Sequence, residues 1–331
     1  MSDVGRLAGV SHQTVSRVIN GSRQVRPETR RRVLEAMREL GYRPNLTARA
    51  LATGRTRTLG VVSFDTTLYG PASTLLGIER AAHGAGYFIV VASMKALTRG
   101  SVADAVDHLR LQGVDGILVI APLHDAAEAL LHTAVDVPLV AVEAGPESDV
   151  PVVEVDQVAG AEKATKHLLD LGHKTVWHIA GPVDFLESRR RLEAWRNTVR
   201  SAGAPPPEPL TGDWSAQSGY DLGRRLARNS EVTAIFAAND QMALGVLRAL
   251  HEAGRSIPRD VSVVGFDDIP EAAYFLPPLT TVRQDFDELG TRSLRVLLGM
   301  IESGETDLAR PPAPRVRPEL VVRASTSVAP R

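Results

Sequence analysis

Residues 7–20 read LAGVSHQTVSRVIN and combine a turn, a helix cap and an amphipathic helix. Gly9 gives a tight turn between two helices its conformational freedom, and Ser11 is a good N-cap. Val10, Val15 and Val18 form an apolar stripe that fastens such a helix to its neighbours. The polar residues of this stretch are Ser11, His12, Gln13, Thr14, Ser16, Arg17 and Asn20. Side chains of this kind read base edges and hold phosphates, so we predict a helix-turn-helix in the major groove of DNA rather than an ordinary polar helix face.

Basic residues are concentrated at the N-terminal end of the chain. Residues 1–60 hold 12 arginines and no lysine against four acidic residues, a net charge of +8. The remaining residues carry 26 basic and 35 acidic side chains, a net charge of −9. A basic end on an acidic body indicates a polyanionic partner at that end only, and nucleic acid is the polyanion it favours.

The chain contains no cysteine, which excludes disulfides and thiolate zinc sites, and we expect neither a metal nor a cofactor. The nine histidines are scattered, and we interpret them as structural. The N-terminus lacks the apolar core of an export signal, and no run approaches the ~20 apolar residues that span a bilayer. We therefore expect a soluble cytoplasmic protein of two or three structural units, with no membrane partner.

The first part of the chain predicts a small helical head and a linker. Helices are expected at about Asp3–Ala8, Ser11–Asn20 and Pro27–Leu40, with Gly41 ending the third. Residues 45–54 can form two further turns of helix, which are too short to be stable alone in water. We expect this hinge helix to fold only against a partner surface.

From residue 58 onward, short apolar strands alternate with amphipathic helices. This α/β pattern is typical of parallel sheets buried on both faces, and its two series predict two Rossmann-like lobes. Ligands of such sheets bind beyond the carboxyl ends of the strands, so we expect a cleft between the lobes. The expected strands lie near 59–63, 88–93, 116–120, 139–142, 175–180, 234–237, 262–264 and 320–322, and the expected helices near 74–86, 101–112, 160–171, 189–202, 217–228 and 240–253.

Short motifs are spread over the whole chain. They are Ala8-Gly9-Val10-Ser11, Thr14-Val15-Ser16-Arg17, Gly41-Tyr42-Arg43-Pro44-Asn45, Leu171-Gly172-His173, Ala180-Gly181-Pro182, Ala238-Asn239-Asp240, Val264-Gly265-Phe266-Asp267-Asp268 and Pro277-Pro278-Leu279-Thr280-Thr281-Val282. In this order they resemble the lactose repressor (LacI) family of bacterial transcription regulators. Residues 212–219 and 283–286 resemble the protein after which that family is named.

The resemblance implies three parts. They are a helix-turn-helix head at residues 1–44, a hinge helix and linker at 45–57, and a periplasmic-binding-protein-like body at 58–331, which binds the effector and dimerises. We assign about 58–155 and 286–314 to the N-terminal lobe of the body, and about 156–283 and 315–331 to the C-terminal lobe.

The resemblance also implies a homodimer on a pseudo-palindromic, double-stranded DNA operator. The hinge helices would lie in the minor groove, where Leu51 matches the family's wedge residue and Asn45, Ala48 and Arg49 line the groove. Alternatively, Leu51 only contacts the body. Met1 lies almost at the start of the first helix, so either the native start lies upstream or a phosphate contact of the family is missing.

Motif matches also assign an effector site. Arg189, Asn239 and Asp267 match the family's hydroxyl-binding residues, and Trp214 would be the aromatic plate under a sugar ring. The floor and walls are expected from Gln284, Phe286, Leu68, Gly70, Pro71, Val155 and Phe185. Glu143 stands where the family's namesake has an aspartate, so its longer side chain would change which sugar fits. As structural alternatives, the asparagine and aspartate cap turns, the arginine is one more surface charge, and the tryptophan belongs to the core.

We therefore predict a repressor whose operator affinity falls when a galactoside-like carbohydrate rearranges the lobes. The alternative is a nucleobase, a nucleoside or another sugar that acts as a co-repressor. A secreted sugar receptor would not need the basic head, and no phosphate-binding, dinucleotide or nucleophile motif favours an enzyme of sugar metabolism. No leucine-heptad segment follows the body, so we expect a dimer rather than a tetramer.

Overall fold

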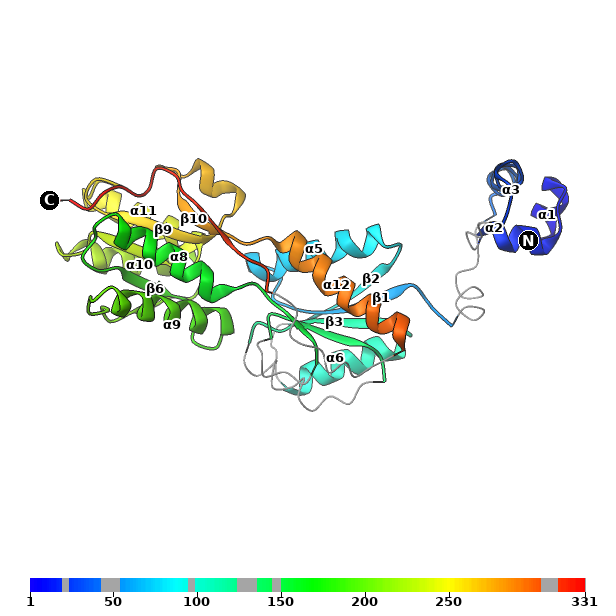
Figure 1. Ribbon diagram of the computed structural model, residues 1–331, viewed down its shortest axis with the longest axis horizontal. Coiled ribbons are helices and arrows are strands. Elements are labelled where there is room, and N and C mark those ends of the chain that lie inside the picture. The colour runs from blue at the N-terminus through cyan, green and yellow to red at the C-terminus, as the bar shows by residue number, and fades with distance from the viewer. Residues whose placement is uncertain are drawn as a thin grey trace. The chain divides into compact units, whose positions relative to one another are not determined.

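A computed structural model of the chain describes residues 1–19, 24–42, 54–94, 99–123, 136–144, 150–304 and 315–330. The chain divides into two compact units, Met1–Thr56 and Arg57–Arg331. Within the described ranges, no helix is long and apolar enough to cross a membrane. Figure 1 shows the helices of the first unit and the helices and strands of the second.

The described part of the first unit is built from the helices α1 (Ser2–Ala8), α2 (His12–Ile19) and α3 (Pro27–Glu39). Its core consists of Val4, Ala8, Val15, Val18, Val33 and Ala36. The turn after α1 places Gly9 in the left-handed region at φ 63°. Ser11 caps α2, because its Oγ accepts a hydrogen bond from the Thr14 N–H at 3.2 Å. The predicted helix-turn-helix is confirmed.

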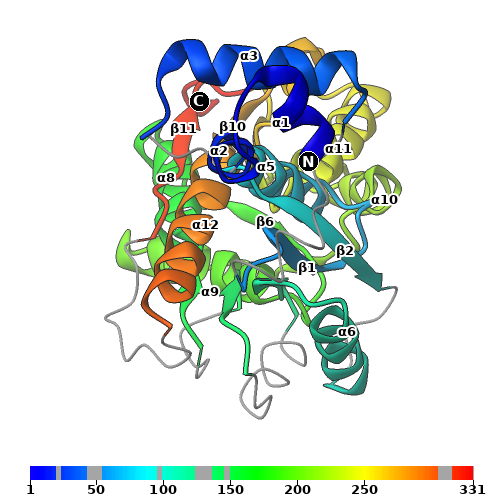
Figure 2. The ribbon, with the colours of Figure 1, turned by 90° about the vertical axis from the view of Figure 1, so that its right-hand side faces the viewer.

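One lobe of the second unit holds a parallel sheet in the order β2 (Phe88–Met94), β1 (Thr58–Phe64), β3 (Gly116–Ile120), β4 (Leu139–Val142) and β5 (Val152–Val153). Helices α5 (Tyr69–Gly84) and α12 (Phe286–Ser303) pack on one face, and α6 (Arg99–Leu111) packs on the other (Figure 1 and Figure 2). Successive residues such as Val61 and Val62 are buried against opposite helical layers. This burial on both faces explains the continuous apolar runs.

The other lobe holds a sheet in the order β11 (Glu319–Val321), β10 (Thr280–Arg283), β9 (Ser262–Asp267), β8 (Ala234–Ala237), β6 (Trp177–Ala180) and β7 (Leu210–Thr211). Only β11 runs antiparallel to its neighbour among the described strands. Helices α8 (Gln157–Asp170) and α9 (Leu186–Ser201) cover one face, and α10 (Ala216–Ala227) and α11 (Asp240–Glu252) cover the other. A short 3-10 helix, η1 (Pro270–Tyr274), follows β9. The predicted pair of α/β lobes is confirmed.

The chain crosses between the lobes after β5, after β10 and before β11. The first and third crossings run side by side, because the Val316 N–H donates to the Glu154 carbonyl group at 2.9 Å. The Glu154 carboxylate, whose side chain is only 7% exposed, binds Arg190 of α9 at 2.7 Å and Arg315 at 2.6 Å. These ion pairs fasten a helix of the second lobe to the crossover.

Several element ends differ from those predicted. Helix α5 begins at Tyr69, and α8 begins at Gln157 because the Asp156 carboxylate caps it, accepting a hydrogen bond from the Ala159 N–H at 3.0 Å. Helix α12 and the strands β5, β7 and β10 are not among the predicted elements. The strands β5 and β7 have two residues each and carry too little pattern to be found. The buried positions of α12 follow helical spacing. Most of the predicted hinge, residues 45–53, lies outside the described residues.

Helices α5 and α12 approach each other closely at a pair of glycines. A Cβ atom on Gly290 would overlap the backbone of Gly77. Replacing glycine by alanine inside a helix ordinarily stabilises it by about 1 kcal/mol. For Gly290→Ala we expect the opposite, because overpacking lowers the free energy of unfolding by about 1–3 kcal/mol.

Urea denaturation monitored by circular dichroism measures this difference. Gly84→Ala is the control, since Gly84 is the last residue of α5, the helix against which α12 packs, and a Cβ atom there meets open space. Its free energy of unfolding should not fall. A Gly290→Ala variant as stable as the wild type would contradict the close packing of the two helices.

Candidate functional site

One candidate site is the outer side of α2. Of the predicted DNA-binding residues, Ser11, His12, Gln13 and Arg17 are exposed, and Thr14 and Ser16 are half-buried. Val15 and Val18 face the opposite way, into the core of the head. The helix therefore presents polar side chains on one side while its apolar side is anchored. Asn20, Asn45, Ala48, Arg49 and Leu51 lie outside the described residues, and their DNA contacts stay predictions.

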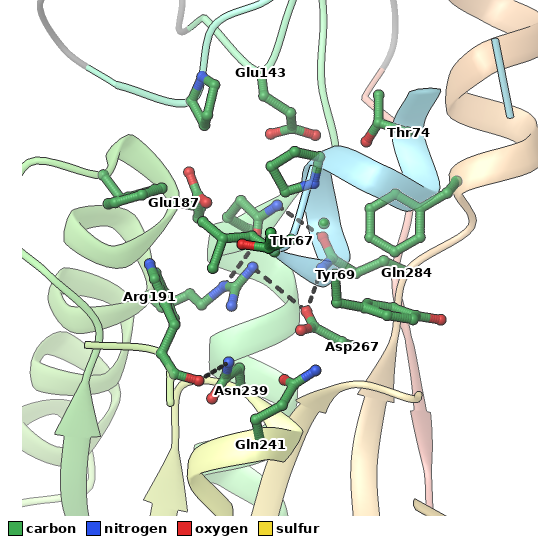
Figure 3. A pocket seen from close by; sticks show the side chains of 18 of the residues that line it. Thr67, Tyr69, Thr74, Glu143, Glu187, Arg191, Asn239, Gln241, Asp267 and Gln284 are labelled. Carbon is green, nitrogen blue, oxygen red and sulfur yellow. Dashed lines mark hydrogen bonds and ion pairs between the residues drawn. The ribbon is translucent and has the colours of Figure 1, made fainter. Parts of the chain in front are cut away.

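The second candidate site is a cavity of about 310 Å³ between the lobes of the second unit (Figure 3). It lies where the carboxyl ends of the strands of both sheets meet, as such folds predict. The predicted residues that line it are Leu68, Gly70, Pro71, Glu143, Phe185, Trp214, Asn239, Asp267, Gln284 and Phe286. Beside the cavity the lobes touch directly, because the Leu186 N–H donates to the Pro122 carbonyl group at 2.8 Å.

Arg191 of α9 organises one wall of the cavity. Its Nε donates to Gln157 Oε1 at 2.9 Å, its Nη1 donates to the Ala238 carbonyl group, and its Nη2 lies 3.9 Å from Asp267 Oδ1. Gln284 donates from Nε2 to Asp267 Oδ1 at 2.7 Å and accepts from Gln157 Nε2 at 2.9 Å. Gln157, Arg191, Asp267 and Gln284 thus form a closed set of contacts, which we call the polar ring. Figure 3 labels Arg191, Asp267 and Gln284 of this set.

The structure corrects two predicted positions. Arg189 does not line the cavity: it is exposed on α9, and its Nε donates to the Val183 carbonyl group. Arg191 lines the cavity in the position that was expected for Arg189. Side chains two residues apart in a helix point to nearly opposite faces, so only one of these two arginines can reach the cavity. Val155 is not a wall residue either. It is fully buried in the first lobe and offers only its N–H, which donates to Glu143 Oε1 at 2.8 Å.

Trp214 belongs to both the wall and the core. Its side chain is packed against Gly181, where a Cβ atom would overlap the indole ring. Phe185 meets the ring edge-on at 5.6 Å between centroids, and the Arg191 guanidinium lies 5.7 Å from its centroid. Asn239 donates from Nδ2 to the Trp214 carbonyl group at 3.0 Å while its Oδ1 caps α11. The capping alternative and the cavity-lining prediction therefore both hold for this asparagine.

Three residues that line the cavity have strained backbone conformations. Glu143, Trp214 and Asp267 have φ values of 63°, 73° and 110°, in the left-handed region that favours glycine. Each such residue costs roughly 1–3 kcal/mol and persists only where the surroundings enforce it. Strain of this kind concentrates at ligand sites, which supports a binding role for the cavity.

Three carboxyl groups in the cavity have raised pKa values. Burial raises the pKa of Glu143 to about 8 and that of Glu187 to about 7. Burial also raises the pKa of Asp267 to about 6, although the charge of Arg191 and the Gln284 hydrogen bond oppose the shift. Such shifts are typical of functional sites.

Sequence reasoning missed several lining residues, namely Tyr69, Gln157, Glu187, Arg191 and Gln241. For two of them a signal was available. Glu187 and Arg191 are four residues apart, so they lie on one face of a helix, and Trp195 continues that face into the core.

Comparison with known proteins finds matches for both units of the chain. Residues 1–45 match the lacI family of bacterial regulatory proteins, and residues 165–326 match the periplasmic binding protein-like domain. The chain is 34% identical to the lactose operon repressor of Escherichia coli (strain K12), over 99% of this chain and 90% of that protein. It is also 34% identical to the ribose operon repressor of the same organism, over 91% of this chain and 92% of that protein.

Among solved structures, the crystal structure of the lac repressor dimer bound to operator and the anti-inducer ONPF matches with a TM-score of 0.85. The identity is 33%, and the match covers 98% of both chains. These relatives are repressors and not enzymes. The chain belongs to the lacI family of bacterial regulatory proteins, as a DNA-binding transcriptional repressor that is regulated by a small-molecule effector.

Proposed function

We propose that this repressor binds a pseudo-palindromic operator as a homodimer and that a small carbohydrate of the galactoside class is its inducer. The observation that carries the proposal is the cavity between the lobes, in which Trp214 lies beside the polar ring. The same chain presents the exposed polar side of α2 on a basic head. One part thus suits DNA and the other suits a small polar ligand.

The lining of the cavity suits a pyranose. A sugar has hydroxyl pairs around its edge and C–H groups on its faces, and it needs bidentate polar groups and an aromatic surface. Asp267, Gln284 and Asn239 supply the polar groups, and Trp214 supplies the aromatic surface. The names of the lactose and ribose operon repressors support a sugar. The galactoside class rests on the resemblance of residues 212–219 and 283–286 to the lactose repressor.

A ligand in this cavity contacts both lobes at once. Leu68 and Glu143 belong to the first lobe, Trp214 and Asp267 to the second, and Gln284 to the crossover. A sugar that binds one arrangement of the lobes better than another shifts the population between them. A difference of about 1–3 kcal/mol per site gives the usual strength of coupling. In our proposal the shift acts through the hinge at residues 45–57 and lowers operator affinity.

Arg17→Ala tests the role of α2. We expect this variant to bind operator DNA about tenfold more weakly or worse, because an arginine in the major groove contributes about 1–3 kcal/mol. Fluorescence anisotropy with DNA from the region upstream of the gene measures the affinity. Arg225→Ala removes an exposed arginine from α10 in the second unit and should bind as the wild type does. An equal loss in both variants would show that only net charge matters and would refute base reading by α2.

A thermal-shift screen of sugars, nucleobases and nucleosides tests the effector. One class of sugar should raise the Tm of the wild type, and no nucleobase or nucleoside should. Arg191→Lys should abolish the response, because a lysine cannot hold Gln157, Ala238 and Asp267 together as the planar guanidinium does. Trp214→Ala should abolish it as well, through loss of the aromatic surface.

Arg189→Lys is the matched control, since this side chain is exposed on the same helix. It should keep the full response to the sugar. Two results would count against the proposal: stabilisation by a nucleobase instead of a sugar, or a sugar response that survives Arg191→Lys and disappears in Arg189→Lys.

A further inference from the structure

We propose that the effector is an amino sugar whose ammonium group is held between Glu143 and Glu187. This inference rests on the proposed carbohydrate effector and narrows its chemical class. Both glutamates line the cavity, and neither belongs to the polar ring.

The two carboxyl groups reach the cavity from opposite lobes. Glu143 follows β4 of the first lobe, and Glu187 lies in the first turn of α9 in the second lobe. Figure 3 shows both side chains directed into the cavity. Glu143 Oε1 accepts the Val155 N–H at 2.8 Å, and Glu187 Oε2 is buried without a hydrogen-bond partner among the described residues. A ligand group that enters between them meets carboxylate oxygens on two sides.

The charges of the cavity do not balance. Glu143, Glu187, Asp213 and Asp267 line it, whereas Arg191 is the only basic residue among its described lining. The Arg191 guanidinium is already engaged by Asp267, Gln157 and the Ala238 carbonyl group. The neighbouring Arg190 is bound to Glu154 at the crossover. The charge of Arg191 acts on Glu187, but no basic side chain of the described lining is hydrogen-bonded to either glutamate, and a cationic ligand group would supply such a partner.

The side-chain atoms of the cavity that lack a hydrogen-bond partner among the described residues are also acceptors. Glu187 Oε2 is buried without a partner in the described part of the chain, as is Gln241 Oε1, which lies on the far side of Asn239 and Asp267 from the two glutamates (Figure 3). An ammonium group carries three donors and no acceptor, which complements such oxygens better than a hydroxyl does. Burial raises the pKa values of both glutamates, and the charge of Glu187 raises that of Glu143 further, so a bound cation would stabilise their ionised forms.

Isothermal titration calorimetry of the full chain tests the inference with matched sets of sugars. Galactosamine, galactose and N-acetylgalactosamine form one set, and the corresponding glucose and mannose compounds form two more. The members of a set differ only in an ammonium, hydroxyl or acetamide group at one carbon. We expect one amino sugar to bind at least about tenfold more tightly than both neutral members of its set, because charge-assisted hydrogen bonds are the stronger ones.

Substitutions identify the groups responsible. Glu143→Gln and Glu187→Gln keep the size of the side chain and one acceptor oxygen but remove the charge. Each should reduce the preference for the amino sugar over its hydroxyl counterpart by about tenfold. Glu193→Gln, at an exposed position of α9 outside the cavity, should leave both affinities unchanged.

The possible outcomes distinguish the amino-sugar inference from the proposed carbohydrate effector on which it rests. If neutral sugars bind as tightly as amino sugars or more tightly, the amino-sugar inference is wrong while the carbohydrate effector stands. The inference is also wrong if the preference survives in both glutamine variants. If no sugar of either kind binds, the proposed effector class fails and the inference fails with it.

Discussion

The buried charge of Arg191 is the constraint on which the cavity depends. A guanidinium that is 3% exposed persists only when it is paired and hydrogen-bonded. The partners come from several elements: Gln157 begins α8, Ala238 follows β8 and Asp267 ends β9. Gln284 closes the polar ring from the crossover. Removing one partner of a buried ion pair costs about 3–5 kcal/mol. The second lobe and the crossover are therefore held in one arrangement around this side chain.

Helix α9 links the cavity to the crossover. Its three consecutive arginines point in different directions, because each residue turns a helix by about 100°. Arg189 is exposed, Arg190 binds Glu154 at the crossover, and Arg191 enters the cavity. Glu187, one turn before Arg191, lies on the cavity side of the same helix. A ligand that moves these side chains acts on the helix that also holds the crossover, which gives the proposed switch a physical route between the lobes.

The parts of this protein that repeat a simple pattern could be predicted from the sequence. Strands β3, β4 and β8 begin and end at the predicted residues, because each is an apolar run buried on both faces. Motif matches also predicted that Asn239 and Asp267 belong to the effector site, and both line the cavity. Within the arginine run a motif match alone selected the wrong residue, although the spacing to buried Trp195 favours Arg191. No local pattern predicts the polar ring, because Gln157 and Gln284 are 127 residues apart in the chain.

The most direct test of the coupling between cavity and DNA is a reciprocal titration on the full chain. Operator affinity is measured with and without saturating sugar, and sugar affinity is measured with and without operator. Because a coupling free energy is shared by both ligands, the two affinities should fall by the same factor, in the range of about 5–150. An operator affinity that is unchanged or higher at saturating sugar would contradict induction through the cavity.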